Sequence, residues 1–128
     1  MRFLSIYKTR ERQAPPTPEE MAKLGKMIEE QMKAGTLLAT EGCLPSVAGA
    51  RVRISGSNIS VTDGPFTESK EVVGGVAILK ANSKAEAIEM AKSFLRVMGE
   101  GECEVRELFE AGAASNPHND ECATANIA

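Results

Sequence analysis

Three charged side chains are the candidates for acid–base chemistry in this sequence. Asp63 ends a segment in which apolar and polar residues alternate, Lys70 lies in the loop that follows it, and Glu41 interrupts an otherwise apolar run. Carboxylates close to a lysine shift the pKa of all these groups, and such sets serve as general acids and bases. We therefore take Asp63, Glu41 and Lys70 as candidate catalytic residues of a cofactor-independent lyase or isomerase.

A wider set of side chains surrounds the same loop, which continues from Asp63-Gly64-Pro65-Phe66 to the glycine pair at 74–75. These side chains could bind a small molecule at the rim of a cleft between sheet and helices: Tyr7, Asp63, Phe66, Glu68, Lys70 and Glu71. A structural interpretation competes with this one, and we favour it for the loop. Gly64 would then take a positive φ in a turn, Phe66 would plug the core, and the glycine pair would mark a bulge or close backbone packing.

The sequence gives little support for a metal site or a cofactor site. His118, Asp120 and Cys122 are closely spaced, but no second group of ligands accompanies them, and the surrounding tail offers no rigid scaffold. There is no phosphate-binding glycine loop, no dinucleotide fingerprint and no nucleophile elbow. We predict neither a metal site nor a cofactor.

Composition excludes several other classes of protein. The chain has 128 residues, a net charge of −3 and no tryptophan, so it lacks the basic, aromatic surface of a nucleic-acid partner. No apolar run approaches the ~20 residues that cross a membrane, and the first strand is too short for a signal peptide. Cys43, Cys103 and Cys122 are too widely spaced for a disulfide framework, which favours reduced thiols in the cytoplasm. We expect Cys43 and Cys103 in the core.

The elements that must position the candidates follow from periodicity and caps. Helix starts stand at Thr17-Pro18-Glu19-Glu20 and at Ser83-Lys84-Ala85-Glu86, and each of these helices ends at a glycine. On the first helix, methionines fall at helical spacing, and we interpret them as core packing rather than as a binding surface. Strands are expected at residues 2–7, 36–44, 50–54, 59–62, 72–80 and 102–109.

This order of elements predicts an α+β, ferredoxin-like β-α-β-(hairpin)-β-α-β sandwich with two helices on one face of an antiparallel sheet. Residues 1–109 form the domain, and 110–128 form a tail that is mobile or associated with the dimer. In the hairpin, Val52, Ile54, Ile59 and Val61 are expected to be buried. Two helices cover only one face of the sheet, so the other face predicts a homodimer through sheet faces.

The sequence resembles the DGPF-type proteins of the YCII-related family. The resemblance is carried by Asp63-Gly64-Pro65-Phe66 with its following charges and glycine pair, by Pro18-Glu19-Glu20-Met21, and by the closing segment 103–108. It implies the dimeric α+β barrel fold in a small bacterial protein. Related YCII proteins have a histidine on the first helix and an aspartate on a following strand, which suggests acid–base chemistry. Here the single histidine is His118, so that dyad is not carried over.

The sequence therefore favours a protein that binds a small metabolite in a cleft between the sheet and the helices of a homodimer. The alternative is the lyase or isomerase that uses Asp63, Glu41 and Lys70. Carboxylates that converge in a dry pocket would favour the enzyme, because a carboxylate base must be raised toward neutral pKa to act efficiently.

Overall fold

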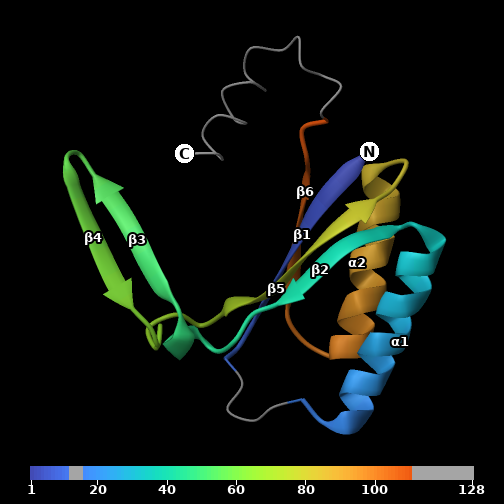
Figure 1. The fold of residues 1–128 in the computed structure, drawn as a ribbon, viewed down its shortest axis with the longest axis horizontal. Helices are drawn as coiled ribbons and strands as arrows, with labels where there is room; N and C mark the ends of the chain where they lie inside the picture. Colours follow the sequence, from blue (N-terminus) through green and yellow to red (C-terminus); the bar gives the residue numbers. More distant parts are fainter. Residues whose placement is uncertain (12–15, 111–128) are drawn as a thin grey trace.

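A computed structural model describes residues 1–11 and 16–110. Four strands form one antiparallel sheet in the order β2-β5-β1-β6. They are β1 (Arg2–Thr9), β2 (Leu37–Gly42), β5 (Val72–Lys80) and β6 (Glu102–Glu107). The helices α1 (Pro18–Ala34) and α2 (Lys84–Met98) both lie on one face of this sheet (Figure 1). This arrangement confirms the α+β, ferredoxin-like fold expected from the sequence.

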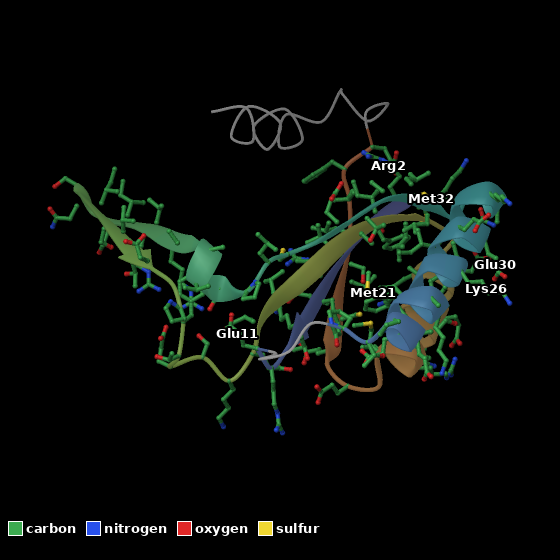
Figure 2. The ribbon with its side chains drawn as sticks, turned by 60° about the horizontal axis from the view of Figure 1, so that its bottom comes forward. Arg2, Glu11, Met21, Lys26, Glu30 and Met32 are labelled. Carbon is green, nitrogen blue, oxygen red and sulfur yellow. The ribbon has the colours of Figure 1, made fainter. Side chains whose placement is uncertain are left out.

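Both helices begin and end where their capping residues stand. The Thr17 hydroxyl accepts a hydrogen bond from the amide of Glu20, and the Ser83 hydroxyl accepts one from the amide of Glu86. Polar residues such as Lys26 and Glu30 lie on the outer side of α1 (Figure 2). Neither described helix is long and apolar enough to span a membrane.

The helix-facing side of the sheet holds the core. Along β1 the burial alternates, and the buried positions Phe3, Ser5, Tyr7 and Thr9 face the helices. Phe3 packs in one cluster with residues from β2, from β5 and the residue that follows it, and from α2: Leu37, Leu79, Ala81 and Ala87. A strand with one packed face alternates in this way because successive side chains point to opposite sides.

The opposite side of the sheet is not covered by either helix. Residues directly opposite each other on neighbouring strands share a face, so the register defines two rows of side chains across the four strands. These rows are Ala39–Ile78–Leu4–Arg106 and Glu41–Val76–Ile6–Glu104. We call this surface the open sheet face. Its centre is aliphatic, and its edges carry charge.

A second, two-stranded sheet projects away from this body (Figure 1). It is a hairpin of β3 (Ala50–Ser55) and β4 (Asn58–Asp63), preceded by a short 3₁₀ turn, η1 (Ser46–Ala48). The expectation that its apolar side chains are buried is wrong for the single chain. Val52, Ile54, Ile59 and Val61 remain 64–70% exposed, because the hairpin stands clear of the helices and of the main sheet.

Candidate functional site

A cavity of about 360 Å³ lies between the helices and the main sheet. It exists because α1 stands off from the strands, so that no residue of this helix is fully buried. The helix residues Leu24 and Met27 are only half-buried and line this space. Ile28 also lines it and packs against the buried cluster around Phe3.

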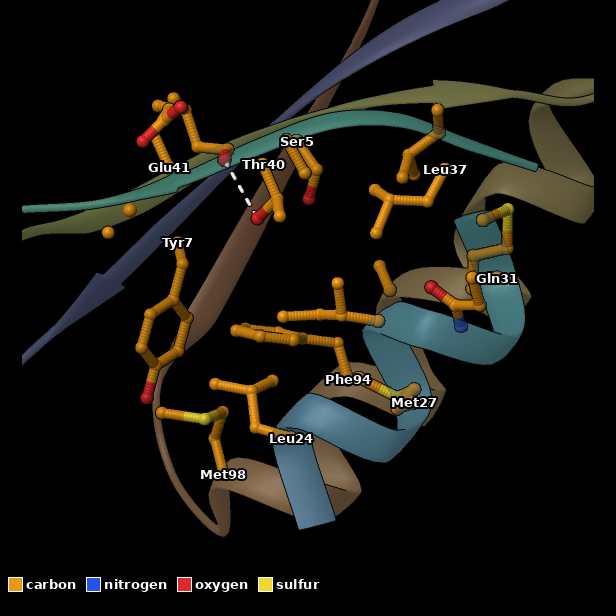
Figure 3. A pocket seen from close by; sticks show the side chains of 18 of the residues that line it. Ser5, Tyr7, Leu24, Met27, Gln31, Leu37, Thr40, Glu41, Phe94 and Met98 are labelled. Carbon is orange, nitrogen blue, oxygen red and sulfur yellow. Dashed lines mark hydrogen bonds between the residues drawn. The ribbon is translucent and has the colours of Figure 1, made fainter. Parts of the chain in front are cut away.

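The walls of the cavity are largely apolar and rich in sulfur. Phe94 and Met98 project from α2 and Met27 from α1, as Figure 3 shows. Met90 and Ala77 complete this part of the lining. Unbranched thioether side chains adapt to irregular shapes and contact aromatic rings favourably. The methionine side chains can therefore adjust the shape of the cavity to an apolar ligand.

The interior offers a few polar groups without charge. Ser5 and Thr40 reach the cavity from the sheet, and Gln31 reaches it from α1. The Thr40 hydroxyl donates to the carbonyl of Val76 over 3.4 Å, which leaves its oxygen free to accept. Within the described part of the chain, the carboxamide of Gln31 makes no hydrogen bond. It can thus both donate to a guest and accept from it.

Tyr7 separates this cavity from a second, more open groove at the ends of the strands, because it lines both. Its hydroxyl donates to the carbonyl of Glu100 over 2.7 Å, and its ring meets the edge of Phe94 with centroids 5.0 Å apart. A Cβ at Gly74 would lie 3.1 Å from this ring, and one at Gly101 would lie 2.5 Å from it. Tyr7, which the sequence offered as a binding residue, lines the cavity, and its hydroxyl is used to fix the wall.

The three predicted acid–base residues do not come together in the cavity. All three side chains are exposed, and no hydrogen bond or ion pair among the described residues joins them. Asp63 ends the projecting hairpin opposite Ala50, and Lys70 lies in the loop before β5. Glu41 lies on β2 beside the cavity, but Figure 3 shows its carboxylate on the far side of the sheet from the helices.

A register shift in β2 explains the direction of Glu41. Leu37 pairs with Leu79 on the helix side, but Ala39 already pairs with Ile78 on the open sheet face. The additional residue, Leu38, reverses the alternation for the rest of the strand. Thr40 consequently faces the cavity, and Glu41 faces away from it.

The loop from Asp63 to Glu71 locks the hairpin to the body. The amide of Gly64 donates to the carbonyl of Gly49 over 2.9 Å, and the amide of Phe66 donates to the hydroxyl of Ser46 over 3.0 Å. Ser46 is in turn held through its amide and its hydroxyl by the carboxylate of Glu11, which lies near the root of the hairpin (Figure 2). The hydrogen bonds from the Ser46 hydroxyl and amide lower the pKa of Glu11.

Two expectations for this loop are wrong. Gly64 does not take a positive φ; a side chain is excluded there because a Cβ would lie 1.6 Å from the carbonyl oxygen of Ser46. Phe66 is half-buried and lies outside the core, with the guanidinium of Arg51 stacked 3.9 Å from its ring centroid. Arg51 also pairs with Glu68 over 2.6 Å and donates to Ser69 over 2.9 Å.

The charged residues of this loop therefore have structural partners or lie in solvent. A hydrogen bond from its own backbone amide and the pairing with Arg51 lower the pKa of Glu68. Glu71 is exposed and lines a groove at the root of the hairpin. The glycine pair behaves as predicted, since the register between β1 and β5 slips by one residue at Gly74.

The described cysteines differ from each other. Cys43 is exposed, so the expectation that it lies in the core is wrong: it follows the end of β2, where the chain leaves the sheet. Cys103 is half-buried, and its burial raises its pKa despite a hydrogen bond with Ser5. Among the described residues, no three metal-ligating side chains come together. His118, Asp120, Cys122 and the rest of the tail beyond Glu110 lie outside the described residues.

The chain is similar to known proteins in sequence. Residues 1–111 match the YCII-related domain. The chain belongs to the YCII-related family. A protein of Rhizobium meliloti (strain 1021), itself described as uncharacterized, is 32% identical to this chain over 89 residues. The matched segment covers 69% of this chain and 72% of that protein. Neither comparison assigns a reaction.

Most of the residues that line the cavity do not stand out in the sequence as site residues. The methionines of α1, Met27 among them, are interpreted from the sequence as core packing, whereas Met27 lines the cavity together with Leu24 and Ile28. The signal that could have indicated a binding cavity was the methionine content, because adaptable methionine side chains are over-represented at binding surfaces.

Proposed function

We propose that this YCII-related protein binds a small, uncharged and mainly apolar metabolite in the cavity between α1, α2 and the main sheet. The observation that carries the proposal is the cavity itself: about 360 Å³ of space whose walls are apolar and whose polar groups are few and convergent. Ligand sites in proteins have this size and this composition.

The charge distribution narrows the class of ligand. Among the described residues that line the cavity, Glu41 alone is charged, and its carboxylate lies on the other side of the sheet. An ionised ligand would therefore lose its hydration without gaining a counter-charge, which is costly. A ring or a branched aliphatic body with one carbonyl or hydroxyl group suits the Gln31 carboxamide and the Thr40 hydroxyl.

We further propose that the binding protein is a homodimer, with the open sheet face as its interface. The aliphatic centre formed by Leu4, Ile6, Val76 and Ile78 and the charged edge at Glu104 and Arg106 have the anatomy of a protein interface. The free thiols of Cys43 and Cys103 support a reducing compartment such as the cytoplasm.

The lyase or isomerase alternative lacks a geometric basis in the single chain. Its three residues, Asp63, Glu41 and Lys70, lie on the hairpin, on the open sheet face and in the connecting loop, and all are exposed. General-base catalysis by a carboxylate is favoured in an enclosed, apolar site, and none of these three exposed side chains lies in one.

Titration with N-phenyl-1-naphthylamine, an uncharged probe that fluoresces in apolar surroundings, tests the binding proposal. We expect saturable binding with one probe per chain. A matched pair of variants locates the probe: Met27→Gln should weaken binding at least tenfold, because it places an amide in the apolar wall, whereas Met21→Gln should leave binding unchanged, because Met21 is 62% exposed and does not line the cavity. Equal effects of the two variants, or unsaturable fluorescence, would refute the proposal.

A further inference from the structure

Two hydroxyl groups of the cavity wall donate their protons to backbone carbonyls of the protein itself. The Tyr7 hydroxyl donates to Glu100 over 2.7 Å, and the Thr40 hydroxyl donates to Val76 over 3.4 Å, which is the dashed line in Figure 3. A hydroxyl group has one proton to donate and two lone pairs that accept. Each of these groups can therefore accept a hydrogen bond from a ligand and keep its backbone bond, whereas it must give up that bond to donate to a ligand.

Ser5, the third hydroxyl of the described lining, is used in the same way. Burial raises the pKa of the Cys103 thiol, and the hydrogen bond with Ser5 acts in the opposite direction. A hydrogen bond has this effect when it is donated to the ionised form, so the Ser5 hydroxyl donates to the sulfur. The hydroxyls on the sheet side of the cavity thus have lone pairs, and not protons, to offer to a ligand.

Ser5 and Thr40 lie at the same level of the sheet with one alanine between them. Both are paired with Ala77 of β5, and both point toward the helices in Figure 3. Because its side chain is one methyl group, Ala77 leaves room for a ligand between the two hydroxyls. The bulge at Leu38 creates this arrangement, since it brings Thr40, and not Glu41, to the cavity side of β2.

Thr40 is better prepared to receive a ligand than the other polar groups of the cavity. Its branched side chain has few conformations at χ1, and its bond to Val76 holds the hydroxyl in place. Gln31 makes no side-chain hydrogen bond within the described part of the chain, so it must lose rotational freedom to bind a ligand. Ser5 is only 8% exposed, whereas Thr40 is half-buried and offers the more accessible oxygen.

We propose that Thr40 determines the specificity of the cavity by accepting a hydrogen bond from the ligand, which is a neutral alcohol, phenol or N–H compound rather than an ether, ester or ketone. This inference rests on the cavity of the proposed function and narrows its class of ligand. A ligand that donates adds a hydrogen bond while Thr40 keeps its bond to Val76. A ligand that only accepts exchanges one hydrogen bond for another, so its net gain is small.

Calorimetric titration with 2-naphthol and 2-methoxynaphthalene tests the proposal, because the two compounds share one ring system and only the naphthol has a donor. We expect the wild type to bind the naphthol at least fivefold more tightly, although the ether is the more apolar compound. Thr40→Val keeps the shape of the side chain and removes the acceptor. It should reverse the preference, with the naphthol weakened at least tenfold and the ether not weakened. Thr40→Ser should retain the preference for the naphthol.

Thr36→Val is the matched control. The Thr36 hydroxyl donates to the backbone carbonyl of Gln31 over 3.3 Å, but Thr36 is not part of the described lining, so its variant should bind both compounds as the wild type does. Circular dichroism checks that the variants fold.

Two results would overturn the role of Thr40 and leave the cavity standing, provided that the fluorescent probe binds in a saturable manner. The first is equal affinity of the wild type for the two compounds. The second is a preference for the naphthol that survives in Thr40→Val, which would assign the acceptor to Gln31 or Ser5. Absence of saturable binding by the probe and by both compounds would refute the ligand site and this inference together.

Discussion

The substitution Ala77→Leu should stabilise the protein and abolish ligand binding. Ala77 faces the helices from β5, opposite Ser5 and Thr40, and lines the cavity. Leucine adds three carbon atoms, and at ~0.8 kcal/mol for each buried methylene their burial contributes about 2.4 kcal/mol. Restricting the longer side chain costs about 0.5–1 kcal/mol. The net gain is roughly 1.5–2 kcal/mol, or a rise in Tm of roughly 5–10 °C for a chain of this size.

Ala87→Leu is the matched control for this prediction. Ala87 is fully buried at 0% exposure inside the packed cluster with Phe3 and Leu79. The same three carbon atoms should there cause overpacking and cost about 1–3 kcal/mol. Urea denaturation and calorimetry measure both variants, and the fluorescent probe measures binding. If Ala77→Leu destabilised the protein as much as Ala87→Leu, the space beside β5 would not exist in solution and the account of the site would fail.

Three further predictions concern the loop and the wall of the cavity. Gly64→Ala should lower the free energy of unfolding by about 2 kcal/mol, since the Cβ must break the two hydrogen bonds of the loop; unchanged urea denaturation would contradict the close contact with Ser46. The pKa of Glu11 lies below its usual value of 4.5 because Ser46 donates hydrogen bonds to its carboxylate. The contribution of Glu11 to stability is therefore present above pH 4.5 and disappears as the pH falls through the lowered pKa. Glu11→Gln should lose this acid dependence of stability, and a stability profile in acid equal to that of the wild type would show that another group causes it. Tyr7→Phe should cost about 0.5–1.5 kcal/mol by denaturation and change probe binding less than twofold, because the hydroxyl donates to Glu100; a tenfold loss of binding would mean that the hydroxyl contacts the ligand.

The elements of the fold could be predicted because their signals are local. Thr17 and Ser83 cap the helices they precede, and the glycines at 35 and 99 end those helices in the left-handed conformation. The order of strands and helices then leaves few antiparallel arrangements. Even the bulge at the glycine pair could be anticipated, since glycine inside an apolar strand often marks one.

The candidate site could not be predicted because it depends on two non-local features. The single unpaired residue at Leu38 decides whether Glu41 or Thr40 faces the helices, and alternation in the sequence does not reveal a bulge. The apolar residues of the hairpin show a correct β pattern, but Val52 and Ile54 are exposed because the hairpin stands clear of the helices and of the main sheet. In both cases the residue types were recognised and the surroundings were not.

Phe66 shows how a correct motif can be given the wrong partner. An aromatic residue after a turn suggests a core position. In the structure, however, the guanidinium of Arg51, from the hairpin, stacks on the ring of Phe66. Such cation–π contacts contribute about 0.5–1 kcal/mol at exposed sites, and here the contact ties the loop to β3. The segment from Asp63 to Glu71 therefore fixes the hairpin in its position, and the cavity lies elsewhere.

The most direct test of the cavity as a ligand site is NMR of the methionine methyl groups, labelled with ¹³C, during addition of uncharged aromatic and alicyclic metabolites. The chain has six methionines; Met27, Met90 and Met98 line the cavity, whereas Met21 and Met32 are 62% and 46% exposed on α1. The account predicts that a bound compound shifts the first three signals in a saturable manner and leaves the other two in place. Shifts confined to Met21 and Met32, or no saturable shift at Met27, Met90 and Met98 with any compound of this class, would contradict it.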